Sequence, residues 1–155
     1  MRAVVQRVAG ARVLAGGDTV GAIGPGLLAF LGVGPTDTDS TARGLAERLA
    51  HLRVFAGERD RMDRSVLDVH GGALVVSQFT LFADCRRGHR PSFTGAAPRD
   101  LADRLCTAVA RALSDLGVAP VATGRFGAHM VVDASGDGPV TVVVSMGDPG
   151  WDTAC

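Results

Sequence analysis

The sequence predicts an α+β fold in which largely antiparallel sheets are covered by two amphipathic helices. Three observations lead to this prediction. About eight short runs have the composition of strands, two longer runs have helical periodicity, and the strands come in groups instead of alternating with helices. With 155 residues, 46% of them hydrophobic, the chain has the size of one domain with its own core.

The N-terminal part of the chain is predicted to be a meander of strands. Residues 2–8 and 12–15 alternate between apolar and other side chains, and the segment 16–18, Gly-Gly-Asp, is a hairpin turn signal. A second turn is predicted at 24–26, Gly-Pro-Gly. The continuous apolar run 27–33 that follows has the length of a central strand.

Two segments have the apolar spacing of helices. A helix is predicted over residues 39–52, where Leu45 and Leu49 belong to one apolar stripe. A second helix is predicted over 98–116, because Pro98 suits a first helical position and Gly117 suits the residue after the last turn. The remaining predicted strands are short and lie at 65–69, 73–84, 118–123, 128–132 and 140–146. The charged run 57–65 is predicted to be a solvated loop.

The strand predicted over residues 73–84 contains polar groups that need hydrogen-bond partners. Strand alternation would place Gln78 and Thr80 on one face and Ser77 and Phe79 on the other. A pocket at this end could then use side chains and main-chain amides. The alternative is a half-buried strand whose polar side chains pair with neighbouring backbone.

Composition and charge exclude several classes of protein. The formal net charge of +0 produces no global attraction to nucleic acid or membranes, so any RNA contact must come from a local patch. The residues Arg86, Arg87, His89 and Arg90 form such a patch in a predicted loop, whose alternative reading is a solvated turn. No run has the ~20 apolar residues of a membrane helix, and the charged N-terminus is unlike a secretory signal. We therefore expect a cytoplasmic protein.

Familiar catalytic and metal-binding patterns are absent from the sequence. The four histidines have no ligand-like spacing, and the three cysteines form no CxxC pair, so no metal or other cofactor is expected. Ser77 or Thr80 could act as a nucleophile only if a base lay near, and no base is evident in the sequence.

Several motifs, taken together and in this order, resemble the D-aminoacyl-tRNA deacylase family. They are MRAVVQRV at 1–8, VGPTD at 33–37, LRVF at 52–55, Met62, SVLDV at 65–69, SQFTLFAD at 77–84, RPSF at 90–93, GRFGA at 124–128 and DGPVT at 137–141. The resemblance runs from residue 1 to about residue 145. It implies one deacylase domain over 1–146 with a barrel-like core, and we expect the tail 147–155 to be partly disordered.

The resemblance implies an esterase that removes D-amino acids, and misattached glycine, from the 3′ end of tRNA. It also implies a homodimer in which Gly138 and Pro139, joined by a cis peptide bond, enter the partner's pocket and exclude L side chains by steric repulsion. A plain hairpin turn is the alternative reading of Gly138 and Pro139. No membrane or DNA partner is implied.

The roles implied for individual residues follow the family motifs. Ser77, Gln78 and Phe79 would hold the terminal adenosine and the aminoacyl group, and Thr80 would lie at the ester. The other implied roles are an adenine contact for Met130, support of the Gly-Pro segment by Arg7, and phosphate contacts for Arg86, Arg87 and Arg90. Bond breaking would rely on the 2′-hydroxyl of the terminal adenosine.

Two residues depart from the family pattern, and two other functions stay open. Gly136 stands where the family usually has Asn, and His129 where it usually has an acidic residue. The departures affect local hydrogen bonds and leave the central motifs unchanged.

The alternative functions are a hydrolase with Thr80 as nucleophile and a non-catalytic RNA-binding module similar to synthetase editing domains.

Overall fold

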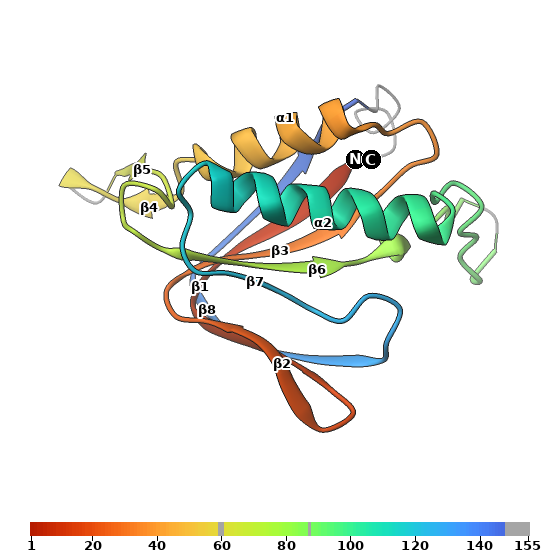
Figure 1. Cartoon of the computed structure of the whole chain (residues 1–155), viewed down its shortest axis with the longest axis horizontal. Coiled ribbons are helices and arrows are strands. Elements are labelled where there is room, and N and C mark those ends of the chain that lie inside the picture. Colours follow the sequence, from red (N-terminus) through yellow and green to blue (C-terminus); the bar gives the residue numbers. More distant parts are fainter. Residues whose placement is uncertain (59–60, 87, 148–155) are drawn as a thin grey trace.

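The computed structural model describes residues 1–58, 61–86 and 88–147. The described residues form one main sheet, a two-stranded ribbon, two α-helices and a short 3-10 helix (Figure 1). The elements in chain order are β1 (Arg2–Ala15), β2 (Asp18–Ile23), β3 (Gly26–Gly32), α1 (Asp39–Ala50), β4 (Phe55–Ala56), β5 (Met62–Arg64), β6 (Gly72–Ser77), η2 (Phe79–Phe82), α2 (Arg99–Asp115), β7 (Val121–Thr123) and β8 (Met130–Ser145).

The main sheet is organised around β1. Strand β1 pairs antiparallel with β2, β3 and β8, and the order across the sheet is β2-β1-β3-β6-β7. The pairs β3–β6 and β6–β7 are parallel, so the sheet is mixed with mainly antiparallel pairing around β1. The predicted α+β class is confirmed.

The sheet curls until its two ends approach one another. At this closure a Cβ added to Gly21 on β2 would overlap the carbonyl oxygen of Thr123 on β7, so only glycine allows the contact. Apolar residues inside the curl form a small core of their own, namely Val8, Ala11, Val13, Ile23, Leu28, Leu74 and Val76. The predicted barrel-like core is confirmed as a nearly closed barrel.

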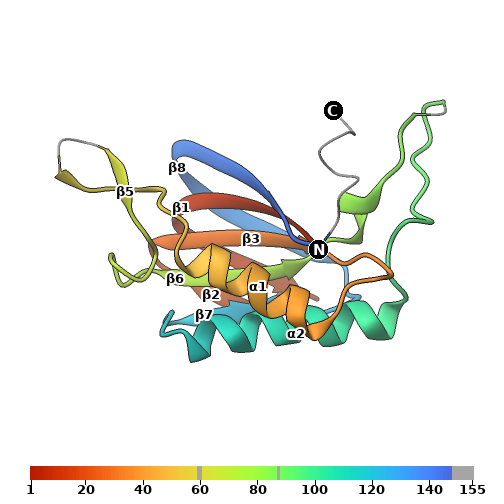
Figure 2. The same ribbon diagram turned by 90° about the horizontal axis from the view of Figure 1, so that it is seen from above.

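Both α-helices lie side by side on one face of the sheet (Figures 1 and 2). Helix α1 begins with a capping box, in which Thr41 N donates to Thr38 Oγ1 and Thr38 N donates to Thr41 Oγ1. The larger core lies between this helical layer and the sheet and includes Leu45, Leu105 and Val109, all at most 1% exposed. Both predicted helices are therefore confirmed, with ends within two residues of those expected.

The strand predicted over 73–84 ends early. Strand β6 stops at Ser77, and the chain then turns into the 3-10 helix η2, so strand alternation does not apply to Gln78, Phe79 and Thr80. Sequence periodicity missed this because the apolar residues Leu81 and Phe82 continue the strand-like composition after the backbone has turned.

A second correction concerns residues 65–69, which are a turn and not a strand. The carboxylate of Asp68 accepts hydrogen bonds from the backbone N and the hydroxyl of Ser65, each at 2.7 Å, and this local pairing competes with extended structure. The short strand β5 lies just before the turn, inside the predicted charged loop, and its three residues are exposed as expected for that loop.

Strands predicted as separate pieces are continuous in the structure. Strand β1 contains the two predicted segments 2–8 and 12–15. Strand β8 begins at Met130, within the predicted segment 128–132, and ends at Ser145, within the predicted segment 140–146. Their pairing is interrupted at one corner, where Gln6 faces Thr141 and Val8 faces Gly136. The segment 137–140 therefore bulges out opposite the single residue Arg7. Figure 2 shows the bend of β8 at this corner.

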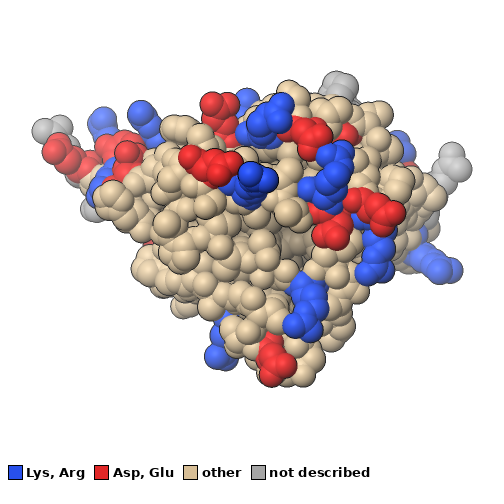
Figure 3. Space-filling model, viewed as in Figure 1, with Lys and Arg blue, Asp and Glu red and all other residues tan. Residues whose placement is uncertain are grey.

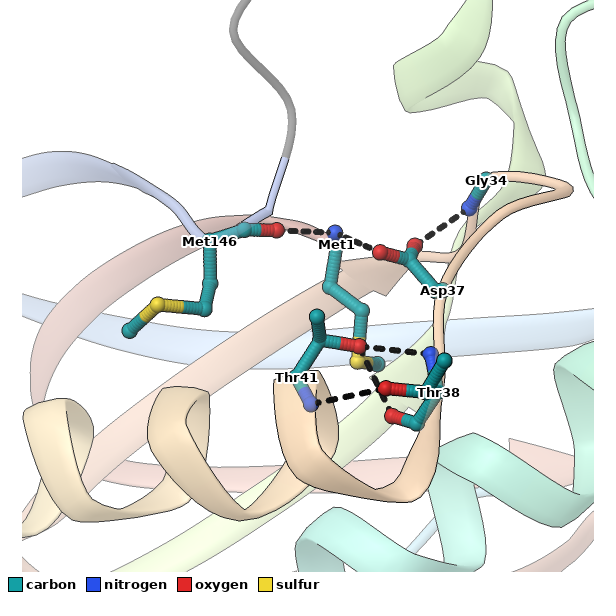
Figure 4. A network of polar contacts seen from close by, with 6 residues as sticks. All are labelled: Met1, Gly34, Asp37, Thr38, Thr41 and Met146. Carbon is teal, nitrogen blue, oxygen red and sulfur yellow. Dashed lines mark hydrogen bonds and ion pairs between the residues drawn. The ribbon is translucent and has the colours of Figure 1, made fainter.

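The N-terminal strand is fixed by a buried ion pair (Figure 4). The ammonium group of Met1 lies 2.6 Å from Asp37 Oδ1 and donates a second hydrogen bond, also 2.6 Å long, to the carbonyl of Met146. The other carboxylate oxygen, Asp37 Oδ2, accepts a hydrogen bond from Gly34 N at 2.7 Å. One carboxylate thus joins the start of β1, the segment after β3 and, through the ammonium, the end of β8.

Candidate functional site

The main candidate site is an apolar pocket at the C-terminal end of β6. Its volume is about 650 Å³, and it lies between η2, the first turns of α2 and the segment that leads into β8. Leu31, Val33 and Val76 contribute apolar side chains from the sheet. A pocket of this size and composition suits a small organic group or the end of a larger molecule.

The polar wall of the pocket is formed by Ser77, Gln78 and Phe79. Ser77 is held in register opposite Leu31 of β3, and Gln78 N donates to the Leu31 carbonyl at 2.7 Å before the chain turns into η2. The first amides of a helix have no partners inside that helix, so the N–H groups of Phe79 and Thr80 have no partner within η2. This local turn allows a ligand to meet main-chain donors that a continued strand would use in pairing.

The helix η2 is supported from behind by the start of β1. Arg2 Nη1 donates to the Leu81 carbonyl at 2.9 Å, and the guanidinium carbon lies 4.1 Å from the centroid of the Phe82 ring. Glycines at 32 and 34 leave room for that ring, because an added Cβ at either position would come within 3.1 Å of it. The polar wall therefore rests on a packed and hydrogen-bonded base.

Aromatic side chains surround the open side of the pocket. Phe79 and Phe93 meet edge to face with ring centroids 5.1 Å apart, and they are 56% and 36% exposed. Across the pocket, the Arg99 guanidinium lies 5.7 Å from the centroid of the Phe126 ring. Exposed aromatic faces at a pocket entrance are suited to stacking against nucleobases.

The pocket contains few groups that could act as acid or base. Burial, with a smaller contribution from the Asp103 carboxylate, raises the pKa of the Cys106 thiol to about 12, so this lining residue stays neutral near pH 7. Among the described lining residues His129 is the only histidine, and none is Asp or Glu. The pocket is therefore equipped to bind and orient a ligand, and it holds no base paired with a nucleophile.

Thr80 lies next to the pocket wall and does not line the pocket itself. Its hydroxyl oxygen accepts a hydrogen bond from the side-chain amide of Gln78. The residue is partly buried, and no histidine or carboxylate of the described residues forms a hydrogen bond with it. This environment does not activate a hydroxyl as a nucleophile.

Gly138 and Pro139 lie outside this pocket. Both are exposed in the bulge at the corner of β1 and β8, opposite Arg7, and neither lines the pocket. The peptide bond between them is cis, as expected. In a single chain, then, these residues and the polar wall are not brought together.

Arg7 contacts the bulge directly. Its Nε lies 2.9 Å from Asp137 Oδ2, in an ion pair without hydrogen-bond geometry, and its Nη1 donates to the Val54 carbonyl at 2.6 Å. The Arg7 side chain is only 13% exposed. It therefore joins the bulge to the segment after α1.

The basic loop predicted to contact phosphates does not line the pocket. Arg86 forms an ion pair with Asp84 at 2.7 Å, and the hydrogen bond and charge of that carboxylate raise the pKa of the guanidinium. Arg90 is exposed, and Arg87 lies outside the described residues. Charged side chains of both signs are mixed over the face that carries the helices (Figure 3).

The structure adds residues that sequence reasoning did not assign to the site. Phe93, Arg99, Cys106, Phe126 and His129 all line the pocket. The motifs at 90–93 and 124–128 contain two of them, and His129 is one of the two departures from the family pattern. No local signal marked Arg99 or Cys106, because each occupies an ordinary position in an amphipathic helix. No cluster of three or more potential metal ligands occurs within residues 1–58, 61–86 and 88–147.

Comparisons with known proteins point to one family. The sequence model of a family described as D-Tyr-tRNA(Tyr) deacylase matches residues 4–145. A protein of Heliobacterium modesticaldum named D-aminoacyl-tRNA deacylase is 56% identical over 144 residues, which are 93% of this chain and 95% of that protein. A protein of the same name from Roseiflexus sp. (strain RS-1) is 58% identical over 144 residues, 93% of this chain and 92% of that protein.

Two solved structures have similar folds. The structure titled c-Myc DNA Unwinding Element Binding Protein has a TM-score of 0.87 and 35% identity, and the match covers 94% of this chain and 98% of that one. A structure described as a probable eukaryotic D-amino acid tRNA deacylase has a TM-score of 0.78 over 92% of this chain and 97% of that one. Its identity of 17% supports similarity of fold only.

Among helices in the described ranges, none is long and apolar enough to cross a membrane.

Proposed function

The chain belongs to the D-Tyr-tRNA(Tyr) deacylase family, and from this membership we propose that its pocket binds the 3′ end of D-aminoacyl-tRNA for hydrolysis of the aminoacyl ester. The enzyme is a D-aminoacyl-tRNA deacylase, which releases a D-amino acid and free tRNA. The observation that supports this pocket as the site is its composition. It combines apolar walls and exposed aromatic rings with one polar wall at Ser77, Gln78 and Phe79.

The proposed chemistry relies on orientation by the protein and on a group of the substrate. Water attacks the ester carbonyl carbon, and the bond to the ribose oxygen breaks. The 2′-hydroxyl of the terminal adenosine lies next to the ester and assists the attack, since the described lining residues supply no paired base. The N–H groups at the start of η2, which have no partner within that helix, would stabilise the negative charge that develops on the carbonyl oxygen. Met130 would contact the adenine from the opposite wall.

We further propose that a second copy of the chain completes each pocket. Gly138 and Pro139 are exposed and separate from the pocket of their own chain. Among the strands of the described ranges, β8 pairs only with β1, and its exposed residues include Val131 and Val143, which are 53% and 50% accessible. An unpaired strand edge with exposed apolar side chains is suited to association with another copy.

In the proposed dimer, the bulge of one copy would enter the pocket of the other. Its main chain would be the obstacle to an L side chain, while a D side chain or the hydrogen of glycine would avoid it. Arg7 would keep the bulge in position through Asp137. This arrangement would permit hydrolysis of glycyl-tRNA as well, and the enzyme would act in the cytoplasm, on charged tRNA.

A release assay tests the proposed function. Purified protein should release the amino acid from D-aminoacyl-tRNA at a rate far above that from the matched L-aminoacyl-tRNA, with glycyl-tRNA as a third substrate. Binding of charged tRNA without release would support the non-catalytic module instead.

A complementation experiment tests the shared pocket. One variant, Phe79→Ala, removes an exposed aromatic ring from the pocket wall, and the other, Gly138→Ala, damages the bulge. If pockets are shared, mixed dimers of the two weak variants regain selective activity, because one of the two pockets has an intact wall and an intact bulge. If the mixed dimers are no more active or selective than either variant alone, the shared pocket is contradicted.

A further inference from the structure

One arginine of the pocket has no role in the chemistry proposed so far. Arg99 is the first residue of α2, is exposed, and lines the pocket. Its guanidinium lies over the Phe126 ring and against the backbone of Gly127, where an added Cβ would overlap Arg99 Nη2. The group is thus held against the opposite wall of the pocket by stacking and close packing.

The guanidinium of Arg99 has no carboxylate partner within the described residues. Other arginines of the described ranges do have such a partner, with an Asp oxygen within 2.9 Å, and they include Arg7, Arg12, Arg86 and Arg104. Arg99 forms no such ion pair, and no Asp or Glu is among the described residues that line its pocket. It is also the only arginine among them. The pocket therefore presents one uncompensated positive charge beside an aromatic ring.

The proposed substrate carries a negative charge close to the group that enters the pocket. If the terminal adenosine and its aminoacyl group fill the pocket, the phosphate on the adenosine 5′ oxygen is the nearest anion. This phosphate links the adenosine to the rest of the tRNA, so it must lie where the RNA leaves the pocket. An exposed guanidinium at the wall, with one face on a ring, still has N–H groups at its edge for two phosphate oxygens.

We propose that Arg99 binds the phosphate between the terminal adenosine and the preceding nucleotide. This inference rests on the proposed function. It assigns to α2 the contact that distinguishes an aminoacyl-tRNA end from a free aminoacyl nucleoside. The basic loop at Arg86 and Arg90 is a weaker candidate for this phosphate, because it does not line the pocket and Arg86 is already paired with Asp84.

The test compares substrates that differ in this one phosphate. The first is a D-aminoacyl ester of adenosine, which lacks the phosphate, and the second is the same ester of the dinucleotide CpA, which has it. D-aminoacyl-tRNA is the third. For Arg99→Ala we expect kcat/KM to fall about tenfold on CpA and tRNA, mainly through KM, as for a lost charge-assisted hydrogen bond. On the adenosine ester, kcat/KM of the variant should stay within about twofold of that of wild type.

Two further variants distinguish loss of the phosphate contact from a general loss of positive charge and from a folding defect. Arg111→Ala removes the same charge from the same helix, twelve residues further along, and should leave all three substrates unaffected. Arg99→Lys keeps a point charge and should recover part of the loss. On single-stranded RNA, losing one phosphate contact should reduce the slope of log(kcat/KM) against log[salt] by about 0.7.

The outcomes distinguish this inference from the proposed function. If wild type hydrolyses neither tRNA nor CpA esters of D-amino acids, the proposed function is wrong. A second outcome is that wild type is active and that Arg99→Ala lowers kcat/KM by the same factor on the adenosine and CpA esters. Arg99 would then contact the base or only support the pocket wall, and the inference would be overturned. Unchanged activity on all three substrates would overturn it too.

Discussion

The side-chain amide of Gln78 donates a hydrogen bond to the hydroxyl oxygen of Thr80. The donor is an amide N–H, so the bond cannot remove the hydroxyl proton as a general base would. It occupies one of the two lone pairs of the hydroxyl oxygen and supplies no base. This relationship favours a structural role for Thr80 in the turn after β6 over the alternative of a threonine nucleophile.

We predict that Thr80→Ala retains deacylase activity, with kcat within about tenfold of wild type, because losing one neutral hydrogen bond costs only about 1 kcal/mol. Single-turnover release from D-aminoacyl-tRNA measures the effect. The matched substrate ends in 2′-deoxyadenosine and should react much more slowly with both proteins. An inactive Thr80→Ala enzyme, together with full wild-type activity on the deoxy substrate, would restore the threonine mechanism.

Gly138→Ala should weaken the discrimination between D- and L-aminoacyl-tRNA. Gly138 has φ of +117°, a region that L residues rarely adopt, and an added Cβ would lie 2.8 Å from Val140 Cγ2 and 2.9 Å from Val140 N. The bulge must therefore shift. We expect the D-to-L ratio of kcat/KM to fall at least about tenfold, in line with the cost of backbone strain.

The control for this variant is Gly136→Ala, two residues earlier. An added Cβ there would meet only the end of the Gln6 side chain, at 3.2 Å, and no positive φ is required. Its D-to-L ratio should stay near that of wild type. If both variants keep the wild-type ratio, the bulge does not determine chiral selectivity.

Asp37→Asn should destabilise the fold. The change removes the charge partner of the Met1 ammonium in a pair whose side chains are 0% and 4% exposed, and it disturbs the contact to Gly34 N. We expect the free energy of unfolding to fall by about 3 kcal/mol, as for other broken buried pairs. Urea denaturation measures the loss. Asp39→Asn breaks an exposed pair with Arg104 and should cost far less, so equal losses would argue against a special role for the buried pair.

The Cys106 thiol should make the stability depend on pH in the alkaline range. Its pKa is raised from 9.0 to about 12 in the folded protein, chiefly by burial. Between these values the unfolded chain loses a proton that the folded protein keeps, so stability is full below pH 9 and falls as the pH rises toward 12. The sequence has no Lys and no Tyr, so few other groups titrate in this range.

The measurement compares wild type with Cys106→Ala at pH 8 and pH 10.5. The free energy of unfolding of wild type should decline more steeply, because only wild type carries the buried thiol. Parallel pH profiles of the two proteins would contradict the assigned cause. Cys85 is exposed and is present in both proteins, so its own titration cancels in the comparison.

The sequence alone determined the helices, the α+β class and the family, because these depend on local patterns. The apolar spacing of 39–52 and 98–116 corresponds closely to α1 and α2. The ordered motifs predicted the family that the comparisons confirm. Short-range patterns failed where a local hydrogen bond or a turn replaced strand pairing, as at Asp68 with Ser65 and at the end of β6.

Only the tertiary structure decided which distant residues share the pocket. Ser77 and Gln78 were predicted from their motif, but Arg99 and Phe126 join them only because α2 and the segment before β8 pack at the same end of the curled sheet. The same closure separates Gly138 from the polar wall of its own chain. Strand order and curvature determine such contacts, and they arise from burial of the whole sheet surface, which no single stretch of sequence encodes.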